Sequence, residues 1–167
     1  MGLFSFLKNA GAKLFGGKDK PVAPVTPQPA DVKDASVQDA LKTQKENLLK
    51  NVITSFGFPV SNLEIELHDD ETAVVYGNVD TTAHKEKIIL AIGNVDGIAS
   101  VDDRMNVTNP EPEADFYQVQ KGDSLSKIAK AFYGDAMKYP VIFEANKPML
   151  TDPDLIYPDQ TLRIPKI

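Results

Sequence analysis

The sequence lacks cysteine and tryptophan, and it contains only two histidines, His68 and His84. Without cysteine, disulfide bonds, thiolate metal sites and cysteine nucleophiles are excluded. Two histidines in separate predicted elements are too few for a multi-histidine zinc or iron site. The formal net charge of −6 argues against nucleic acid as a main partner, because phosphate binding requires a basic surface.

Long hydrophobic runs are also missing. No stretch approaches the roughly 20 apolar residues that a membrane-spanning helix needs. The apolar start of the chain ends at Lys8 and has no basic residue before it, so it does not fit a signal peptide. Gly2 does not fit a myristoylation motif, because Phe6 stands where that motif has Ser or Thr. We therefore expect a cytoplasmic protein.

The 167 residues fall into five predicted segments. Hydrophobic residues make up 42% and charged residues 25%, which is typical of globular domains, and clustered prolines mark the linkers. The segments are an N-terminal amphipathic helix at 1–16, a Pro-rich linker at 17–36, a domain at 37–109, a linker at 110–115 and a domain at 116–167. The middle domain carries most of the negative charge, which attracts cations diffusely.

The N-terminal segment has its apolar residues at helical spacing. They are Leu3, Phe4, Phe6, Leu7, Ala10, Ala12, Leu14 and Phe15, and Gly16 ends the pattern. This pattern predicts a short helix that docks on a domain. A helix on a membrane surface also fits, because aromatic and Lys side chains suit a lipid interface. A frayed chain end is the third interpretation.

The domain at 37–109 is predicted to have the order α-β-β-α-β. The first helix has an apolar stripe of Val37, Leu41, Leu48, Leu49, Val52, Ile53 and Phe56. The other predicted elements are strands at 63–67 and 72–79, a helix at 82–93 and a strand at 98–107. This order indicates an α+β fold with both helices on one face of a sheet.

This order, together with Gly77, Gly93 and Gly97-Ile98, resembles a BON domain. The resemblance covers residues 37–109. It implies association with the cell envelope and binding of phospholipid or another small ligand.

The domain at 116–167 is predicted to have the order β-α-α-β. A strand ends at Gly122, a helix begins after Asp123 or Ser124, and the last strand at 161–164 pairs with the first. The motif residues are Tyr117, Val119, Gly122, Leu125, Ile128, Ala129, Tyr133, Gly134, Asn146, Pro148, Ile156, Pro158, Leu162 and Ile164. They resemble a LysM domain over its whole length. Asp159 stands where that family usually has Gly in a turn, and Asp tolerates a left-handed turn.

The LysM resemblance implies binding of N-acetylglucosamine polymers such as peptidoglycan. The implied groove contains Gly122, Asp123, Ser124, Leu125, Pro148 and Ile156. The chain lacks tryptophan, the strongest sugar-stacking side chain, and has no predicted export signal.

The whole arrangement resembles a family of small cytoplasmic potassium-binding proteins of bacteria. Three stretches carry this resemblance, namely residues 1–11, 93–103 and 142–150. It implies selective binding of K⁺ over Na⁺, a more compact shape with the ion bound, a role in potassium sensing or stress response, and no catalysis. We expect a monomer whose ligand is K⁺, with Rb⁺, Cs⁺ and NH₄⁺ as competitors of similar radius.

Two places in the sequence offer neutral backbone carbonyls, which selective K⁺ sites use. The first is the predicted C-terminus of the first helix, where the carbonyls of Leu7 and Ala10 lack intrahelical partners. The second is the turn at Gly93, Val95 and Ile98. We hypothesise that the N-terminal helix docks on this turn with the ion between them. A helix cap and a turn that hold no ion is the alternative structural interpretation.

Other functions find less support. Asp69-Asp70-Glu71 and Asp102-Asp103 are interpreted as solvated turn and strand residues, since clustered carboxylates would favour Ca²⁺ or Mg²⁺. No catalytic pair or phosphate loop is present. The alternative function is an envelope adaptor that binds glycan and phospholipid through its two domains.

Overall fold

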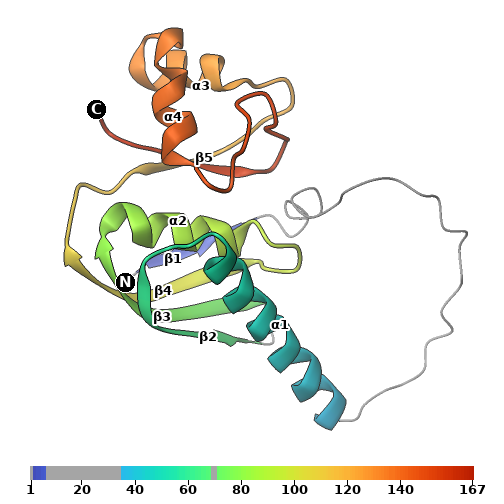
Figure 1. The fold of residues 1–167 in the computed structure, drawn as a ribbon. Helices are drawn as coiled ribbons and strands as arrows, with labels where there is room; N and C mark the ends of the chain where they lie inside the picture. The colour runs from blue at the N-terminus through green and yellow to red at the C-terminus, as the bar shows by residue number, and fades with distance from the viewer. Residues whose placement is uncertain (1, 7–34, 69–70) are drawn as a thin grey trace, which may run out of the picture.

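The structure is a computed structural model that describes residues 2–6, 35–68 and 71–167. Most of the predicted first helix and almost all of the Pro-rich linker lie outside these residues. The described chain forms two packed units (Figure 1). The N-terminal unit comprises residues 2–6 and 35–109, and the C-terminal unit comprises residues 115–167.

The N-terminal unit confirms the predicted α+β fold and its α-β-β-α-β order. Its elements are α1 (Ala35–Ser55), β2 (Val60–Leu67), β3 (Thr72–Thr81), α2 (Thr82–Gly93) and β4 (Ser100–Asn109). The hairpin strands β2 and β3 are antiparallel, and β4 lies parallel to β3 because α2 crosses between them. Both helices cover the same face of the sheet (Figure 1).

The first residues of the chain correct the sequence prediction. Gly2–Ser5 form a strand, β1, which pairs antiparallel with β4 and gives the sheet order β1-β4-β3-β2. A helix was predicted because the apolar residues also fit helical spacing. In so short a segment, the free edge of β4 offers backbone hydrogen bonds that outweigh local propensity.

The core lies between the sheet and the two helices. Ile88, Ile89 and Ile92 of α2 are completely buried, as is Ile53 of α1. Strands β3 and β4 supply Val75 and Val101 from the facing side of the sheet, and Phe6 closes the core next to β1.

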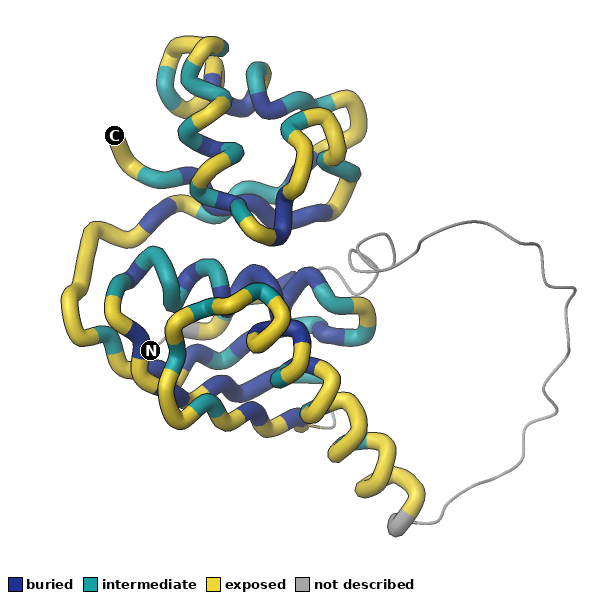
Figure 2. Tube along the Cα trace, in the orientation of Figure 1, coloured by how far each residue is buried: buried dark blue, intermediate teal, exposed yellow. Residues whose placement is uncertain are grey.

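Only part of the predicted stripe on α1 is buried. Leu49, Val52 and Ile53 face the sheet, but Val37, Leu41 and Leu48 are 42%, 54% and 53% exposed. The N-terminal half of α1, which carries Val37 and Leu41, extends beyond the sheet, so no strand of the described residues lies under it (Figure 2). The predicted helix is thus present, but only the C-terminal part of its apolar stripe contributes to the core.

The C-terminal unit has the predicted β-α-α-β order. Its elements are β5 (Asp115–Gln118), α3 (Leu125–Tyr133), the short 3₁₀ helix η2 (Ala136–Lys138), α4 (Tyr139–Ala145) and β6 (Thr161–Ile164). Ser124 caps α3 by accepting a hydrogen bond from the Lys127 N–H. Asp159 has a φ of 73°, which confirms that Asp takes a left-handed conformation in this turn.

Replacing Phe6 with Ala should lower the free energy of unfolding by about 3 kcal/mol, because it removes a buried ring from the core. The side chain of Phe6 is 8% exposed, whereas that of Leu3, on the strand that precedes it, is 67% exposed. Leu3→Ala is therefore the matched control, with an expected change below about 0.5 kcal/mol. Urea denaturation measures both values, and equal losses would contradict the placement of Phe6.

Candidate functional site

The turn that was predicted to supply carbonyl ligands follows the buried helix α2. The Thr81 side chain caps the start of α2 by accepting from the His84 N–H, and Asn94 ends it by donating its N–H to the Leu90 carbonyl. The Val95 N–H then donates to the Ile92 carbonyl at 3.0 Å. Gly97 has a φ of +84°, a backbone conformation that glycine adopts without strain.

The three predicted carbonyls in this turn differ in their hydrogen bonding. The Val95 carbonyl accepts a long bond of 3.3 Å from the Ile98 N–H. Within residues 2–6, 35–68 and 71–167, no backbone N–H donates to the carbonyl of Gly93 or Ile98. Both residues are buried, where carbonyls generally have a partner. These two oxygens are thus the stronger candidates for ligands.

Phe6 brings the N-terminus of the chain to this turn. Its N–H donates to the Ala99 carbonyl at 2.8 Å, one residue after Ile98. Its ring lies directly on Gly93, and a Cβ at that position would overlap the ring. Glycine is therefore needed here for close approach, a reason that the sequence pattern did not reveal.

The other two predicted ligands, Leu7 and Ala10, lie outside the described residues. Leu7 follows Phe6 directly in the sequence. The predicted docking of the N-terminus on the turn thus has a described counterpart in Phe6, although residues 2–5 form a strand and no helix.

The described acidic and histidine side chains do not converge on a metal site of their own. In the described part of the chain, no group of three or more His, Asp or Glu side chains is placed to hold a metal ion. Asp103 is 1% exposed, but it pairs with Lys85 at 3.1 Å and accepts from the Met105 N–H. Asp69 and Asp70 lie outside the described residues.

Asn94 ties the turn to the C-terminal unit. Its side-chain Nδ2 donates to the Thr161 carbonyl, and its Oδ1 accepts from the Thr161 N–H, both at 3.1 Å. Thr161 is the first residue of β6, and Asn94 is 1% exposed. The side chain that follows Gly93 therefore pairs with a strand of the other unit.

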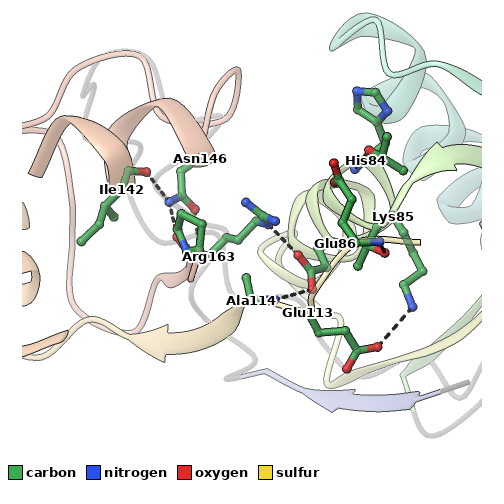
Figure 3. Close-up of polar contacts among 12 residues, drawn as sticks. His84, Lys85, Glu86, Glu113, Ala114, Ile142, Asn146 and Arg163 are labelled. Carbon is green, nitrogen blue, oxygen red and sulfur yellow. Dashed lines mark hydrogen bonds and ion pairs between the residues drawn. The ribbon is translucent and has the colours of Figure 1, made fainter. Parts of the chain in front are cut away.

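A buried ion pair forms a second tie between the units (Figure 3). Arg163 Nε on β6 lies 2.6 Å from Glu86 Oε2 on α2, and both side chains are almost fully buried. Glu86 Oε1 accepts from the Ala114 N–H at 2.8 Å, so both of its oxygens have donors. Burial, together with the positive charge of Arg163, lowers the pKa of the neighbouring Lys87 ammonium.

The segment that links the two units, residues 110–114, runs alongside α2. The Glu111 N–H donates to Thr82 Oγ1 at 2.9 Å, and Glu113 lies 3.8 Å from the Lys85 ammonium. Ala114 then donates to Glu86, as described above. The acceptor residues lie along the first turns of α2, so this segment is bound to the N-terminal unit.

The sequence interpretation did not identify Phe6, Asn94, Glu86 or Arg163 in these roles. Glu86 did give a signal, because it lies one helical turn before Leu90 on an otherwise apolar face of α2. A charged side chain in that position indicates a buried partner. The identity of that partner, 77 residues further along the chain, left no local pattern.

The six residues of the implied glycan groove are only partly brought together. Pro148 and Ile156 line a pocket of about 500 Å³, and Phe56, which follows α1, lines it too. Gly122, Asp123, Ser124 and Leu125 do not line this pocket. In this stretch the Gly122 carbonyl accepts from Lys127 Nζ, and Asp123 accepts from Tyr117 Oη.

Residues next to the implied groove pack against the N-terminal unit. Met149 is 8% exposed and belongs to the core of that unit. Phe116 of β5 lies against Phe4 of β1, with ring centroids 5.0 Å apart. One wall of the pocket is thus made by the contact between the units.

Tyr157 lines the same pocket and carries a buried hydroxyl group. Among the described residues this hydroxyl has no hydrogen-bond partner. Burial disfavours the charged phenolate and raises the pKa of Tyr157 to about 12.

Comparisons with known proteins match both units. Residues 36–109 match the BON domain family, and residues 117–165 match the LysM domain family. The chain is 43% identical to the potassium binding protein Kbp of Escherichia coli O6:H1, and the alignment covers 99% of each chain. A stretch of 49 residues is 55% identical to an uncharacterised protein of Deinococcus radiodurans, covering 29% of this chain and 19% of that one. Within the described residues, none of the helices has the length and hydropathy needed to cross a membrane.

Glu86→Gln should lower the free energy of unfolding by about 3 kcal/mol, because it leaves the Arg163 charge buried without its counter-ion. The control is Glu144→Gln, which breaks a pair of the same length, 2.6 Å to Lys147, between exposed side chains. Its loss should stay below about 1 kcal/mol. Urea denaturation gives both numbers, and similar losses would contradict a buried ion pair at Glu86.

Tyr157→Phe should raise the free energy of unfolding by about 1 kcal/mol, because it removes a buried hydroxyl group that lacks a partner. Tyr133→Phe is the control, since Tyr133 Oη donates to the Pro165 carbonyl at 2.6 Å, and its loss should destabilise the protein. The wild-type protein should also lose stability as the pH rises from about 10 to about 12, where the unfolded chain releases the Tyr157 proton first. A Tyr157→Phe variant that is less stable than the wild type would refute this.

Proposed function

The chain belongs to the same family as the potassium binding protein Kbp, and from this relationship together with the geometry of the turn after α2 we propose that it binds K⁺ selectively. The observation that carries the proposal is the 43% identity over 99% of both chains. The relative is named as a binding protein, and the proposed function includes no catalytic step.

The chemistry of the turn supports this proposal. K⁺ is a large monovalent ion, and selective sites replace its water shell with neutral carbonyl oxygens. The carbonyls of Gly93 and Ile98 receive no backbone N–H from the described residues, and that of Val95 receives only a long bond. A cluster of carboxylates would instead favour Ca²⁺ or Mg²⁺.

We assign the remaining ligands to the N-terminal segment. Leu7 and Ala10 are the candidates, and the ring of Phe6 on Gly93 fixes the chain immediately before them. The ion would then lie between this segment and the turn. Rb⁺, Cs⁺ and NH₄⁺ would compete, because a carbonyl site of this size admits ions of similar radius.

Ion binding would favour the compact arrangement of the two units. Asn94 joins the turn to Thr161 of β6, so an ion that orders the turn also orders the surface on which β6 rests. By linkage, docking of the C-terminal unit would raise the affinity for K⁺ by the same factor. The proposed function is thus that of a K⁺ sensor whose two units dock more tightly when the ion is bound.

The envelope adaptor is the less favoured function. A LysM domain that reads a glycan polymer needs an open groove, whereas Phe56 lines the pocket that contains Pro148 and Ile156. Met149, which follows Pro148, is buried in the core of the N-terminal unit. These contacts support an internal role for this part of the LysM domain.

Titration calorimetry with KCl and NaCl at matched ionic strength tests the proposal. We expect a saturable isotherm with K⁺ and none with Na⁺, because a carbonyl site sized for K⁺ fits the smaller ion poorly. Small-angle scattering should show a smaller radius of gyration in K⁺. Heat with neither ion would reject the proposed function and make the adaptor the next hypothesis, to be tested by cell-wall pull-down.

A deletion tests the assignment of Leu7 and Ala10 separately. Removing residues 7–16 keeps β1 and Phe6 and leaves residues 17–34, which can span about 60 Å when extended. Affinity for K⁺ should fall at least tenfold while the thermal midpoint without K⁺ stays unchanged. Unchanged affinity would reject ligands from this segment without rejecting K⁺ binding.

A further inference from the structure

A lysine side chain from α1 lies beside the candidate turn. The Nζ atom of Lys45 is 3.7 Å from the position that a Cβ would take at Gly97. Gly97 lies between Val95 and Ile98, two of the candidate ligand residues. An ammonium group therefore lies against the backbone of the loop that is proposed to hold K⁺.

Among the described residues, this ammonium group has no bonded partner, neither in the loop nor elsewhere. Across the described ranges of the chain, Lys45 takes part in no hydrogen bond and no ion pair. Its side chain is exposed, so little packing would resist its movement. The position of Lys45 on α1 thus brings its ammonium group to the loop, and no bond holds the group there.

A lysine ammonium and K⁺ share the features that a carbonyl site recognises. Both are compact monovalent cations, and the ammonium offers three N–H donors to carbonyl oxygens. A loop that binds K⁺ through neutral carbonyls therefore also attracts this group. The two cations cannot both stay close to the loop, because like charges repel.

We infer that Lys45 is a tethered competitor of K⁺, whose ammonium lies at the Gly93–Ile98 loop in the ion-free protein and is displaced when K⁺ binds. This inference rests on the proposed function. Tethering on α1 keeps the effective concentration of the ammonium high, so Lys45 weakens the apparent affinity. Its role would be to set the K⁺ concentration at which the protein responds.

A pocket beside α1 can accept the Lys45 side chain after K⁺ has displaced it. Lys45 also lines a pocket of about 450 Å³, whose walls include Asp39 and Glu71. Rotation about its side-chain bonds would bring the ammonium towards these carboxylates without a change in α1. The exchange thus needs no rearrangement of the backbone on the Lys45 side.

The test compares Lys45→Met with Lys42→Met in the full chain by titration calorimetry with KCl at matched ionic strength. Met keeps the length of the side chain and removes the charge. Lys42 lines the same pocket one turn earlier on α1, so its variant controls for the general loss of positive charge. Lys45→Met should lower the Kd for K⁺ about fivefold, and Lys42→Met should change it less than twofold. Equal effects, or no effect of Lys45→Met, would overturn the inference.

Lys45→Arg separates competition from simple repulsion. It keeps the charge, but the planar guanidinium is too large for the place of a K⁺ ion. A tethered competitor predicts a Kd near that of Lys45→Met. A Kd equal to that of the wild type, with Lys45→Met binding more tightly, would assign the effect to general repulsion and overturn the inference. If the wild-type chain takes up no K⁺ at all, the proposed function itself fails, so the two failures are distinguishable.

Discussion

Helix α2 is buried on two sides, and this constraint determines how the two units meet. On one side its isoleucines fill the core against the sheet, and on the other Glu86 meets Arg163 of β6 (Figures 1 and 3). A carboxylate that is 1% exposed must be paired, because an unpaired buried charge costs several kcal/mol. The position of β6 over α2 is therefore fixed by an electrostatic requirement, to which the Ala114 N–H adds a second donor.

The C-terminal end of α2, which leads into the candidate ion site, is also fixed by contacts on two sides. Phe6 lies on Gly93 from the side of the sheet, and the next residue, Asn94, pairs with Thr161 from the side of the LysM domain. The turn is thus held at once by Phe6, which follows β1, and by Thr161 of β6. A shift of the turn would therefore alter the contacts of both, which supports the proposed coupling between ion binding and domain docking.

The side chains of two asparagines form the backbone hydrogen bonds that a further strand would form at the second edge of β6. One edge of this strand pairs with β5, and the N–H and C=O groups of Thr161 and Arg163 lie on the other. Asn146, from within the LysM domain, pairs with Arg163, while Asn94, from the BON domain, pairs with Thr161. Unpaired strand edges are costly when buried, so the LysM domain depends on its neighbour for part of its hydrogen bonding. This dependence distinguishes docked domains from two modules joined by a flexible linker.

The α+β class, the α-β-β-α-β and β-α-α-β orders and the turn at Gly93–Ile98 can all be predicted from the sequence, because hydrophobic period, helix caps and turn residues are local signals. It also carried the family relationship, since motif spacing survives over the whole chain. Three features become visible only in the folded chain: Gly2–Ser5 form a strand, Leu41 stays exposed, and Glu86 and Asn94 join the domains. The physical reason is that each of these depends on a partner far away in the chain. A free strand edge, a missing sheet surface or a buried counter-ion produces no hydrophobic pattern in the sequence around the residue whose structure depends on it.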